Sequence, residues 1–336
     1  MKLKKSLICA CALIGSLAVS AITPLATAAE TVRLKVATQY AKDHPSTKAL
    51  YEFKDRVEKE SDGRINIRIF PANQLGDYTQ VYEELRRGTI DMGLISVPSQ
   101  FDTRLEMLYL HYLASDFNEA RKIYARGSFL WNTANDLHNK LGVRFLGFNI
   151  EGTGGLGLIK KPENLKDPHA DKDILLRVPQ MDVFKTAADD EGFDTVAIPF
   201  AELYTALQTG VADGWSGGPP VVNYLQFGDV IKYFLVNNNF IESTSYLMSD
   251  KVWKKLSKED QELIAKATTA LSEQSFDIAE ENDGKYLKLM ADKGIEVIYL
   301  SEEQLKAWAT LARQETWPKL EERLTPEIIN GLKSQY

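Results

Sequence analysis

The chain has 336 residues, and its 44% hydrophobic and 10% aromatic content is ordinary for a globular protein with a buried core, of about two domains by length. Its 47 acidic residues outnumber its 40 basic ones, so the formal net charge is −7, which argues against nucleic acid or an anionic membrane surface as a partner. No stretch after the first 28 residues is apolar enough to span a bilayer, so direct insertion into a membrane is not expected.

The first 28 residues have the pattern of a secretory signal peptide. Three lysines stand among the first five residues, residues 7–21 form an apolar stretch, and the small residues 26–28 suit a cleavage site. Cleavage there would remove three lysines and no acid, so the formal net charge would change from −7 to −10. Cys9 and Cys11 both lie in this segment, so the exported chain would carry no disulfide. A membrane anchor and a lipoprotein are the alternatives, but the apolar run is short and continues past both cysteines.

The start of the exported chain predicts a parallel α/β sheet. Alternating apolar residues indicate strands at 32–38, 65–69 and 90–97. A helix is expected to begin at Pro45, between the first two strands, and another to end at Gly88, before the third. The order strand, helix, strand, helix, strand is typical of a parallel sheet covered by helices.

A glycine-rich segment follows the strand expected at 141–150. Gly152, Gly154 and Gly157 match the GxGxxG signature of dinucleotide-binding proteins. That signature requires a helix directly after it, whereas the residues up to Pro162 have an extended pattern. A crossing between two domains is therefore the better explanation of these glycines.

The expected division of the chain has four parts. They are a signal peptide at 1–28, domain I at 29–153 with 240–260 returning to it, domain II at 154–239, and a long spanning helix with C-terminal helices at 258–336. The crossings between the domains are expected at 151–155 and 237–240. Both are interpretations of the pattern of strands and glycines.

The C-terminal part predicts one unusually long helix. Ser257 and Asp260 have the spacing of a helix cap, and the helical pattern continues from 258 to about 292. At 1.5 Å per residue such a helix would be roughly 50 Å long, enough to lie along two domains. Ser301 with Gln304 is expected to cap the next helix.

The strand predicted at 174–179 contains a charged residue, Arg177, in an apolar run. A buried arginine is costly unless its charge is met, and its planar guanidinium can hold a carboxylate through two parallel hydrogen bonds. The carboxylate could belong to a ligand or to an acidic side chain of the protein. The residue by itself leaves both open.

The stretch 198–220 combines a short helix with a glycine- and proline-rich segment. Residues 201–209 suit a helix that Gly210 ends, and the residues after it are expected to form a loop in which Trp215 is exposed. Residues 214–218 also match GxSxG, the nucleophile motif of serine hydrolases. That motif needs a histidine later in the chain, and all four histidines precede Ser216. A secreted hydrolase is therefore a weaker alternative.

Four segments together form a longer pattern. They are SDGRINIRIFPANQLG at 61–76, LRRGTIDM at 85–92, LRVP at 176–179 and PFAELYTALQTGVADG at 199–214. These segments closely resemble the solute-binding proteins of TRAP transporters, the DctP family. The last two match a long and specific motif of that family, and the resemblance covers nearly the whole exported chain.

The resemblance implies an α/β fold of two domains, the periplasmic-binding-protein fold, with a hinged cleft and a long helix spanning both domains. It implies a periplasmic protein that captures a small organic acid, closes on it and delivers it to the membrane permease subunits of a TRAP transporter. No catalytic residue, cofactor or metal is expected, so the chain is not predicted to be an enzyme. In the family the arginine of the LRVP strand holds the carboxylate of the ligand, which gives this role to Arg177.

Departures from the family pattern indicate the kind of acid. Members that bind sialic acid or dicarboxylates surround the ligand with polar groups, whereas Gly152–Gly154 here lacks a second arginine. Trp215 stands in place of a glutamine, Gly217 in place of an asparagine, and Phe240, next to Asn239, in place of a histidine. The glycines at 154 and 217 are expected to leave room for a ring. The resemblance therefore predicts a monocarboxylate with an aromatic or apolar body, and the first candidates are aryl- or indole-bearing 2-oxo acids and acetates.

Two alternatives to this ligand class stay open. Trp215 could pack into the core between the domains, and the ligand could be an ordinary small acid such as a C4-dicarboxylate or a sugar acid. The candidate ligand-binding residues are Arg177, Trp215, Phe200, Asn239, Phe240, Gly154, Gly217, Tyr78, Ser96 and His44.

Overall fold

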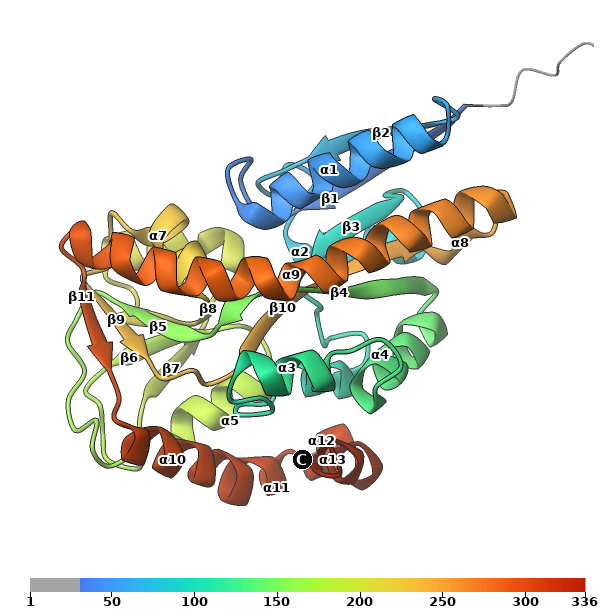
Figure 1. Cartoon of the computed structure of the whole chain (residues 1–336). Coiled ribbons are helices and arrows are strands. Elements are labelled where there is room, and N and C mark those ends of the chain that lie inside the picture. The colour runs from blue at the N-terminus through green and yellow to red at the C-terminus, as the bar shows by residue number, and fades with distance from the viewer. Residues whose placement is uncertain (1–30, 336) are drawn as a thin grey trace, which may run out of the picture. The chain divides into compact units, whose positions relative to one another are not determined.

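The structure is a computed structural model that describes residues 31–335, so the predicted signal peptide lies outside the described residues. One of its two sheets has five strands in the order β2-β1-β3-β10-β4 (Figure 1). These strands are β1 (Val32–Thr38), β2 (Ile65–Phe70), β3 (Met92–Ile95), β4 (Val143–Thr153) and β10 (Ile241–Ser249). β1 pairs in parallel with β2 and β3, which confirms the predicted arrangement of the first three strands. β10 pairs antiparallel with β3 and β4, so the complete sheet is mixed.

Helices connect and cover these strands. They are α1 (Pro45–Glu60), α2 (Tyr78–Arg87), the 3₁₀ helix η1 (Thr103–Tyr109), α3 (Phe117–Ile123), α4 (Phe129–Lys140) and α8 (Asp250–Trp253). α1 begins at Pro45 as predicted, because proline suits the first helical position. Asp77 and Gln80 form a capping box at the start of α2, and Gly88 ends that helix with a left-handed backbone angle φ of 82°.

The second sheet has six strands in the order β11-β9-β5-β8-β6-β7. The strands are β5 (Gly155–Leu158), β6 (Leu175–Val178), β7 (Asp194–Ala197), β8 (Gly214–Gly218), β9 (Tyr233–Val236) and β11 (Glu296–Tyr299). The connecting helices are α5 (Asp182–Asp190), the 3₁₀ helix η2 (Phe200–Glu202), α6 (Leu203–Thr209) and α7 (Pro220–Phe227). Gly210 ends α6 in a left-handed conformation, which confirms the predicted stop. The expected loop after it was wrong, because residues 214–218 form β8.

The chain passes from one sheet to the other at two neighbouring places. β4 belongs to the five-stranded sheet and β5 to the six-stranded one, with Gly154 between them. Residues 237–240 make the return from β9 to β10, and the Gly154 N–H donates to the Phe240 carbonyl oxygen at 2.7 Å. A Cβ atom on Gly154 would lie 2.6 Å from a ring carbon of Phe240. The glycine therefore permits this close approach, and a strand rather than a helix follows it.

The helix α9 (Lys258–Asp292) has the bounds that the sequence predicts and lies along both sheets (Figure 1). Its cap is also as predicted, since the Asp260 N–H donates to the Ser257 hydroxyl at 3.1 Å. Ile264 and Leu271 pack with the apolar residues of β1, β2 and α1. Tyr286 and Met290, farther along the helix, belong to the cluster of Trp215 and other residues of the six-stranded side. One rigid element therefore contacts both halves of an α/β fold with two domains.

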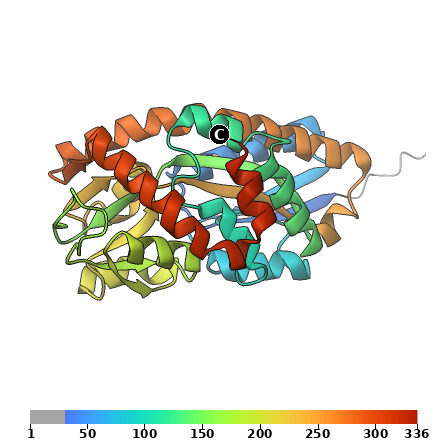
Figure 2. The ribbon, with the colours of Figure 1, turned by 90° about the horizontal axis from the view of Figure 1, so that it is seen from below.

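The C-terminal helices make a second connection between the two sides. They are α10 (Glu302–Leu311), the π-helical turn η3 (Ala312–Thr316), α11 (Trp317–Lys319), α12 (Glu321–Leu324) and α13 (Pro326–Lys333). Seen from below, they run from the six-stranded sheet toward η1 and α4 (Figure 2). The predicted capping box of Ser301 and Gln304 is present at the start of α10.

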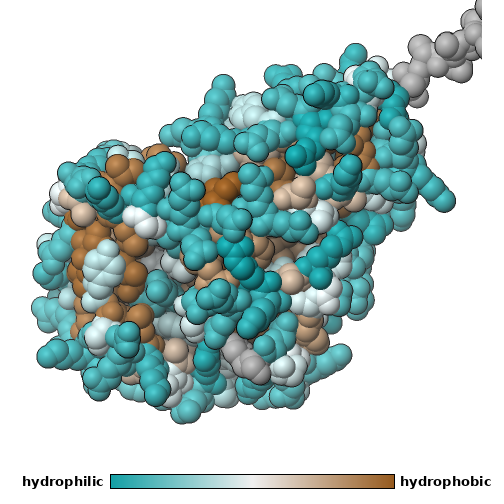
Figure 3. All heavy atoms as spheres, in the orientation of Figure 1, coloured by the Kyte–Doolittle hydropathy of each residue, from teal (hydrophilic) through white to brown (hydrophobic). Residues whose placement is uncertain are grey.

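The face of the molecule shown in Figure 3 carries mostly hydrophilic residues, with smaller hydrophobic patches between them. Within residues 31–335, no helix combines the length and the apolar character that crossing a bilayer requires.

Candidate functional site

A cavity of about 30 Å³ lies between the two sheets and is lined from both of them. From the five-stranded side it is lined by Gln39, Tyr40, Tyr78, Ser96, Tyr109 and Glu242. From the six-stranded side it is lined by Arg177, Pro179, Met181, Phe184, Phe200, Trp215, Gly217 and Val222. We call this space the central cavity. This volume is far below the roughly 300–1,000 Å³ of pockets that hold small-molecule ligands, so an organic acid requires the two sides to move apart.

Arg177 brings a positive charge into the central cavity. It lies on β6 with only 2% of its surface exposed, and its Nε donates to the Ile198 carbonyl oxygen at 2.7 Å. None of the carboxylates among residues 31–335 lies within 4.0 Å of the guanidinium nitrogens, so the ion pair with a protein acid that the sequence left open is absent. Burial lowers the pKa of Arg177 to about 10, and the residue is still charged at neutral pH.

Trp215 forms part of the wall beside Arg177. Its indole is 1% exposed, donates from Nε1 to Asn223 Oδ1 at 3.0 Å, and lies 4.9 Å from the ring of Phe227 between centroids. The expectation of an exposed Trp215 was wrong because the neighbouring glycines make room for it. A Cβ atom on Gly218 would lie 2.1 Å from the indole, and one on Gly157 would lie 2.7 Å from Nε1.

Glu242 is a second ionisable residue of the central cavity, and the sequence reasoning missed it. It lies on β10 with 4% of its surface exposed. Burial and then the charge of Glu151 raise the pKa of Glu242 well above its usual range, while a hydrogen bond with Ser96 and the charge of Arg177 act in the opposite direction. The signal that could have found it is the one used for Arg177, a charged residue within a strand.

A buried acidic group lies behind Glu242 on β4. Glu151 accepts hydrogen bonds from Thr244 Oγ1 at 2.7 Å, Ser46 Oγ at 3.0 Å and Asn149 Nδ2 at 3.3 Å. Burial raises the pKa of Glu151 to about 7. Glu151 lines a different cavity, of about 210 Å³, between α1, β4 and α9.

His44 faces this other cavity and not the central one. Its Nδ1 accepts the Ser46 N–H at 3.2 Å and so caps α1, and its ring stacks on Tyr40 with centroids 4.0 Å apart. Burial lowers the pKa of His44 to about 3, so the ring is neutral.

The structure brings six of the ten candidate residues together and leaves four outside. Arg177, Trp215, Phe200, Gly217, Tyr78 and Ser96 line the central cavity, whereas Asn239, Phe240, Gly154 and His44 do not. Phe240 packs one layer behind the wall, edge-on to Phe184 at 5.3 Å and stacked on His111 at 5.8 Å between centroids. The expectation that Gly154 leaves room for a ring was wrong, because the Phe240 and Asn239 side chains fill the space beside it.

The geometry does not support the hydrolase alternative. Ser216 lies within β8, 1% exposed, and its hydroxyl has no hydrogen-bond partner among the described residues. His111 pairs with Glu191 and His138 with Tyr82, so neither is placed to activate it. Residues 31–335 also contain no group of three histidine, cysteine or acidic side chains arranged to hold a metal ion.

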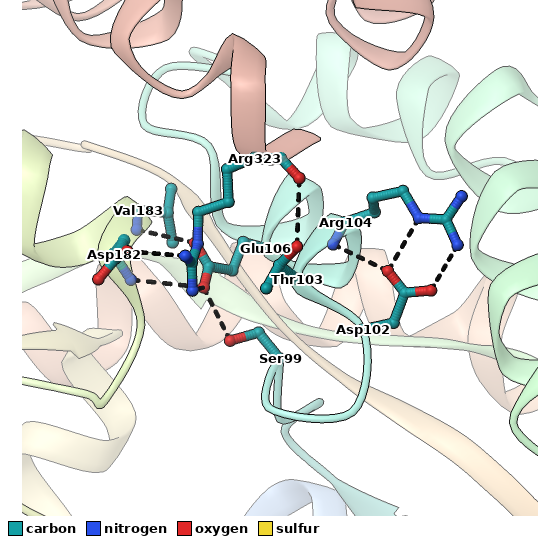
Figure 4. Close-up of polar contacts among 8 residues, drawn as sticks. All are labelled: Ser99, Asp102, Thr103, Arg104, Glu106, Asp182, Val183 and Arg323. Carbon is teal, nitrogen blue, oxygen red and sulfur yellow. Dashed lines mark hydrogen bonds and ion pairs between the residues drawn. The ribbon is translucent and has the colours of Figure 1, made fainter. Parts of the chain in front are cut away.

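Glu106, another residue that the sequence reasoning missed, joins the two sides next to the central cavity (Figure 4). It lies on η1, fully buried, and accepts the Val183 N–H at 3.1 Å at the start of α5. It also accepts Ser99 Oγ at 2.8 Å, and the guanidinium of Arg323 binds it from α12 through Nε and Nη2, both at 3.0 Å. η1 follows β3 of the five-stranded sheet, and α5 follows β6 of the six-stranded sheet. These contacts therefore link a segment of one side to a segment of the other.

Comparison with known proteins identifies what this arrangement is similar to. The model of the family described as bacterial extracellular solute-binding protein, family 7, DctP, matches residues 36–323. The chain is 24% identical over 328 residues to the C4-dicarboxylate-binding periplasmic protein DctP of Rhodobacter capsulatus, covering 96% of each. It is 25% identical over 247 residues to the sialic acid-binding periplasmic protein SiaP of Vibrio cholerae, covering 73% of this chain and 76% of that protein.

A solved structure has the same fold. A TRAP periplasmic solute-binding protein of Haemophilus influenzae with bound L-gulonate superposes with a TM-score of 0.80 at 26% identity. The match covers 91% of this chain and 100% of that one. Two of these similar proteins are named for different acids, and the third was solved with another acid bound. The similarity therefore defines the class of protein but not its ligand.

Proposed function

The chain belongs to family 7 of the bacterial extracellular solute-binding proteins, and from this premise we propose that it captures a monocarboxylate with an aromatic or apolar body. It is the solute-binding subunit of a TRAP transporter and not an enzyme. Residues 1–28 would direct it to the periplasm, and the membrane permease subunits of the transporter would receive the ligand.

The observation that carries the ligand class is the single unpaired cation of the central cavity. Arg177 is buried and charged, and no described carboxylate neutralises it. A ligand carboxylate would meet the charge with two parallel hydrogen bonds. A second carboxylate on the ligand would find no second cation among the lining residues and would face the buried acid Glu242. A monoanion is therefore favoured over a dicarboxylate.

The remaining wall of the central cavity favours an apolar body. Six aromatic residues line it, namely Tyr40, Tyr78, Tyr109, Phe184, Phe200 and Trp215. Aromatic side chains bury a large area, and aromatic pairs add about 0.5–1.5 kcal/mol beyond that burial. The hydroxyl-rich body of a sugar acid would need a hydrogen-bond partner for each hydroxyl. Among the polar lining residues, Gln39 and Ser96 already bond to each other, and the Tyr109 hydroxyl bonds to the Val97 backbone. Sugar acids and C4-dicarboxylates, which similar proteins bind, are the comparison ligands.

A melting-temperature screen of small carboxylates tests this proposal. A ligand that binds only the folded protein raises the melting temperature. At a free ligand concentration of a hundred times the dissociation constant, it adds about 2.7 kcal/mol to the free energy of unfolding. We expect aryl- and indole-bearing 2-oxo acids and acetates to give the largest shifts and branched aliphatic acids smaller ones. Tight binding of succinate or a sugar acid, with no shift from any aromatic acid, would contradict the proposed ligand class.

Titration with an aromatic acid should quench the fluorescence of Trp215. The indole lies in the wall of the central cavity, so a bound ring would change its surroundings directly. The chain has five tryptophans, and the Trp215→Phe variant serves as the control because it retains the other four. The quenching should disappear in this variant while a calorimetric titration still detects binding. Equal quenching in the two proteins would place the acid elsewhere.

Ligand binding should make the molecule more compact in solution. We propose that the domains 29–153 with 240–260, and 154–239, close about the crossings at 151–155 and 237–240, because the chain changes sheets there. The central cavity is small and lined from both sides, so entry requires an open form that the ligand then converts to the closed one. Small-angle scattering should therefore give a smaller radius of gyration with ligand. An unchanged radius at saturation would count against domain closure.

A further inference from the structure

Glu242 is the one carboxylic acid that lines the central cavity, and the proposed binding of a monocarboxylate by Arg177 gives it no role. It forms no ion pair with any described residue. The charged and titratable groups that act on it are Glu151 on β4, Arg177 on β6, and the phenols of Tyr40, Tyr78 and Tyr109. Glu151 favours the neutral form of Glu242, the phenols have raised pKa values and are themselves uncharged at neutral pH, and Arg177 is the only cation among these groups.

The charges of the site balance only if Glu242 stays uncharged. Arg177 and a ligand carboxylate together sum to zero, and an ionised Glu242 would leave a net negative charge in a buried space. Burial and Glu151 already raise the pKa of Glu242 well above its usual range. A ligand carboxylate close by would raise it further, because a like charge disfavours ionisation. The hydroxyl of a protonated carboxyl is a hydrogen-bond donor.

We propose that Glu242 recognises the ligand as a neutral carboxylic acid, donating its hydroxyl hydrogen to an oxygen on carbon 2 next to the ligand's carboxylate. The ligand class is then the 2-oxo and 2-hydroxy monocarboxylates, with 2-oxo acids as the main members. This inference rests on the proposed function, since it needs the carboxylate at Arg177.

The position of the accepted oxygen follows from the size of the cavity. Arg177 and Glu242 line the same space of about 30 Å³, and the charge of each acts on the pKa of the other. When the two sides close on the ligand, an atom next to a carboxylate held by Arg177 would therefore face Glu242 across the cavity. The aromatic residues of the wall, including Phe184, Phe200 and Trp215, remain for the rest of the ligand.

A ligand with an amine on carbon 2 would require Glu242 to be ionised. A zwitterionic amino acid carries an ammonium group, which only an ionised Glu242 would neutralise. Binding of such an amino acid would release the proton of Glu242 to the buffer. Four acids with the same ring and chain length separate these cases: phenylpyruvate with a 2-oxo group, 3-phenyllactate with a 2-hydroxyl, phenylalanine with a 2-amino group and 3-phenylpropanoate with none.

Calorimetric titration of the full chain with the four acids tests the inference. In the unchanged protein, phenylpyruvate should bind at least about fivefold more tightly than 3-phenylpropanoate, since a buried partner left without its hydrogen bond costs about 1–3 kcal/mol. Glu242→Gln keeps an uncharged donor of the same size and should retain this preference. Glu242→Leu has no donor, so the two acids should then bind within about twofold of each other. A melting curve of each variant establishes that it is folded.

Three outcomes would overturn the inference. They are phenylalanine binding most tightly with release of a proton, Glu242→Gln losing the preference for phenylpyruvate, and Glu242→Leu keeping it. Each of these leaves the proposed function standing, because acids still bind. If no acid binds to the unchanged protein, the proposed function and the inference both fail. Glu191→Gln is the matched control, because Glu191 is buried against His111 outside the central cavity and its substitution should leave the ratio unchanged.

Discussion

Replacing Arg177 by alanine should lower the affinity for the best-bound acid by at least tenfold. The guanidinium is the only cation of the central cavity, so its removal leaves the ligand carboxylate buried without a partner. Truncating one member of a buried, hydrogen-bonded charge pair costs about 2–5 kcal/mol, and a tenfold loss corresponds to only about 1.4 kcal/mol. Calorimetric titration of a folded Arg177→Ala protein gives the result, and an unchanged affinity would contradict the role of this residue.

Lysine and methionine at position 177 separate charge from geometry. Arg177→Lys keeps the charge but loses the planar fork, so an affinity between those of the original and alanine proteins is expected. Arg177→Met should raise the melting temperature of the ligand-free protein, because a buried guanidinium that bonds only the Ile198 carbonyl oxygen among the described residues is costly to desolvate. Arg144→Ala is the matched control, since Arg144 pairs with Asp250 away from the central cavity and should not affect binding.

The parts of the fold that local chemistry determines could be predicted from the sequence. α9 has its predicted bounds because a serine cap and a continuous helical pattern are both local signals. The same holds for Gly210, whose left-handed backbone ends α6. Arg177 could be singled out for a related reason, since a charge in an apolar strand is visible along the chain without knowledge of its neighbours.

The parts that depend on contacts between distant segments could not be predicted. Residues 214–218 contain three glycines, which locally favour a loop, but in the fold Gly218 makes space for the indole of Trp215 and Gly214 for the side chain of Leu158. Phe240 and Gly154 were chosen by motif position, which does not determine the direction of a side chain at a crossing between sheets. Glu242 lies in a strand whose every residue is buried, and only the pairing of β10 with its neighbours places it at the cavity.

Replacing Glu106 should destabilise the folded protein, and it should destabilise the closed form more strongly than the open one. Glu106, on η1, accepts hydrogen bonds from Ser99 in the preceding segment, from α5 and from α12, and it has no exposed surface (Figure 4). In Glu106→Ala, the Val183 N–H loses its partner, and Arg323 keeps only its contact with Asp182 at 2.8 Å. Removing one partner of a buried ion pair costs about 3–5 kcal/mol, and the partial exposure of Arg323 places the expected loss near the lower end. Urea unfolding of the ligand-free protein measures this loss.

The Glu106 contacts join the connections of the two sheets, so they should also favour the closed form in which the ligand is bound. We therefore expect Glu106→Ala to lower the affinity for the acid although Glu106 does not line the central cavity. Glu106→Gln, which keeps an acceptor for the Val183 N–H but loses the charge that pairs with Arg323, should give smaller losses of stability and affinity. Asp102→Asn is the matched control: Asp102 precedes η1, binds Arg104 in its first turn and reaches neither α5 nor α12. If Asp102→Asn and Glu106→Ala had equal effects on affinity, Glu106 would act only on the local stability of η1 and would not hold the two sides together.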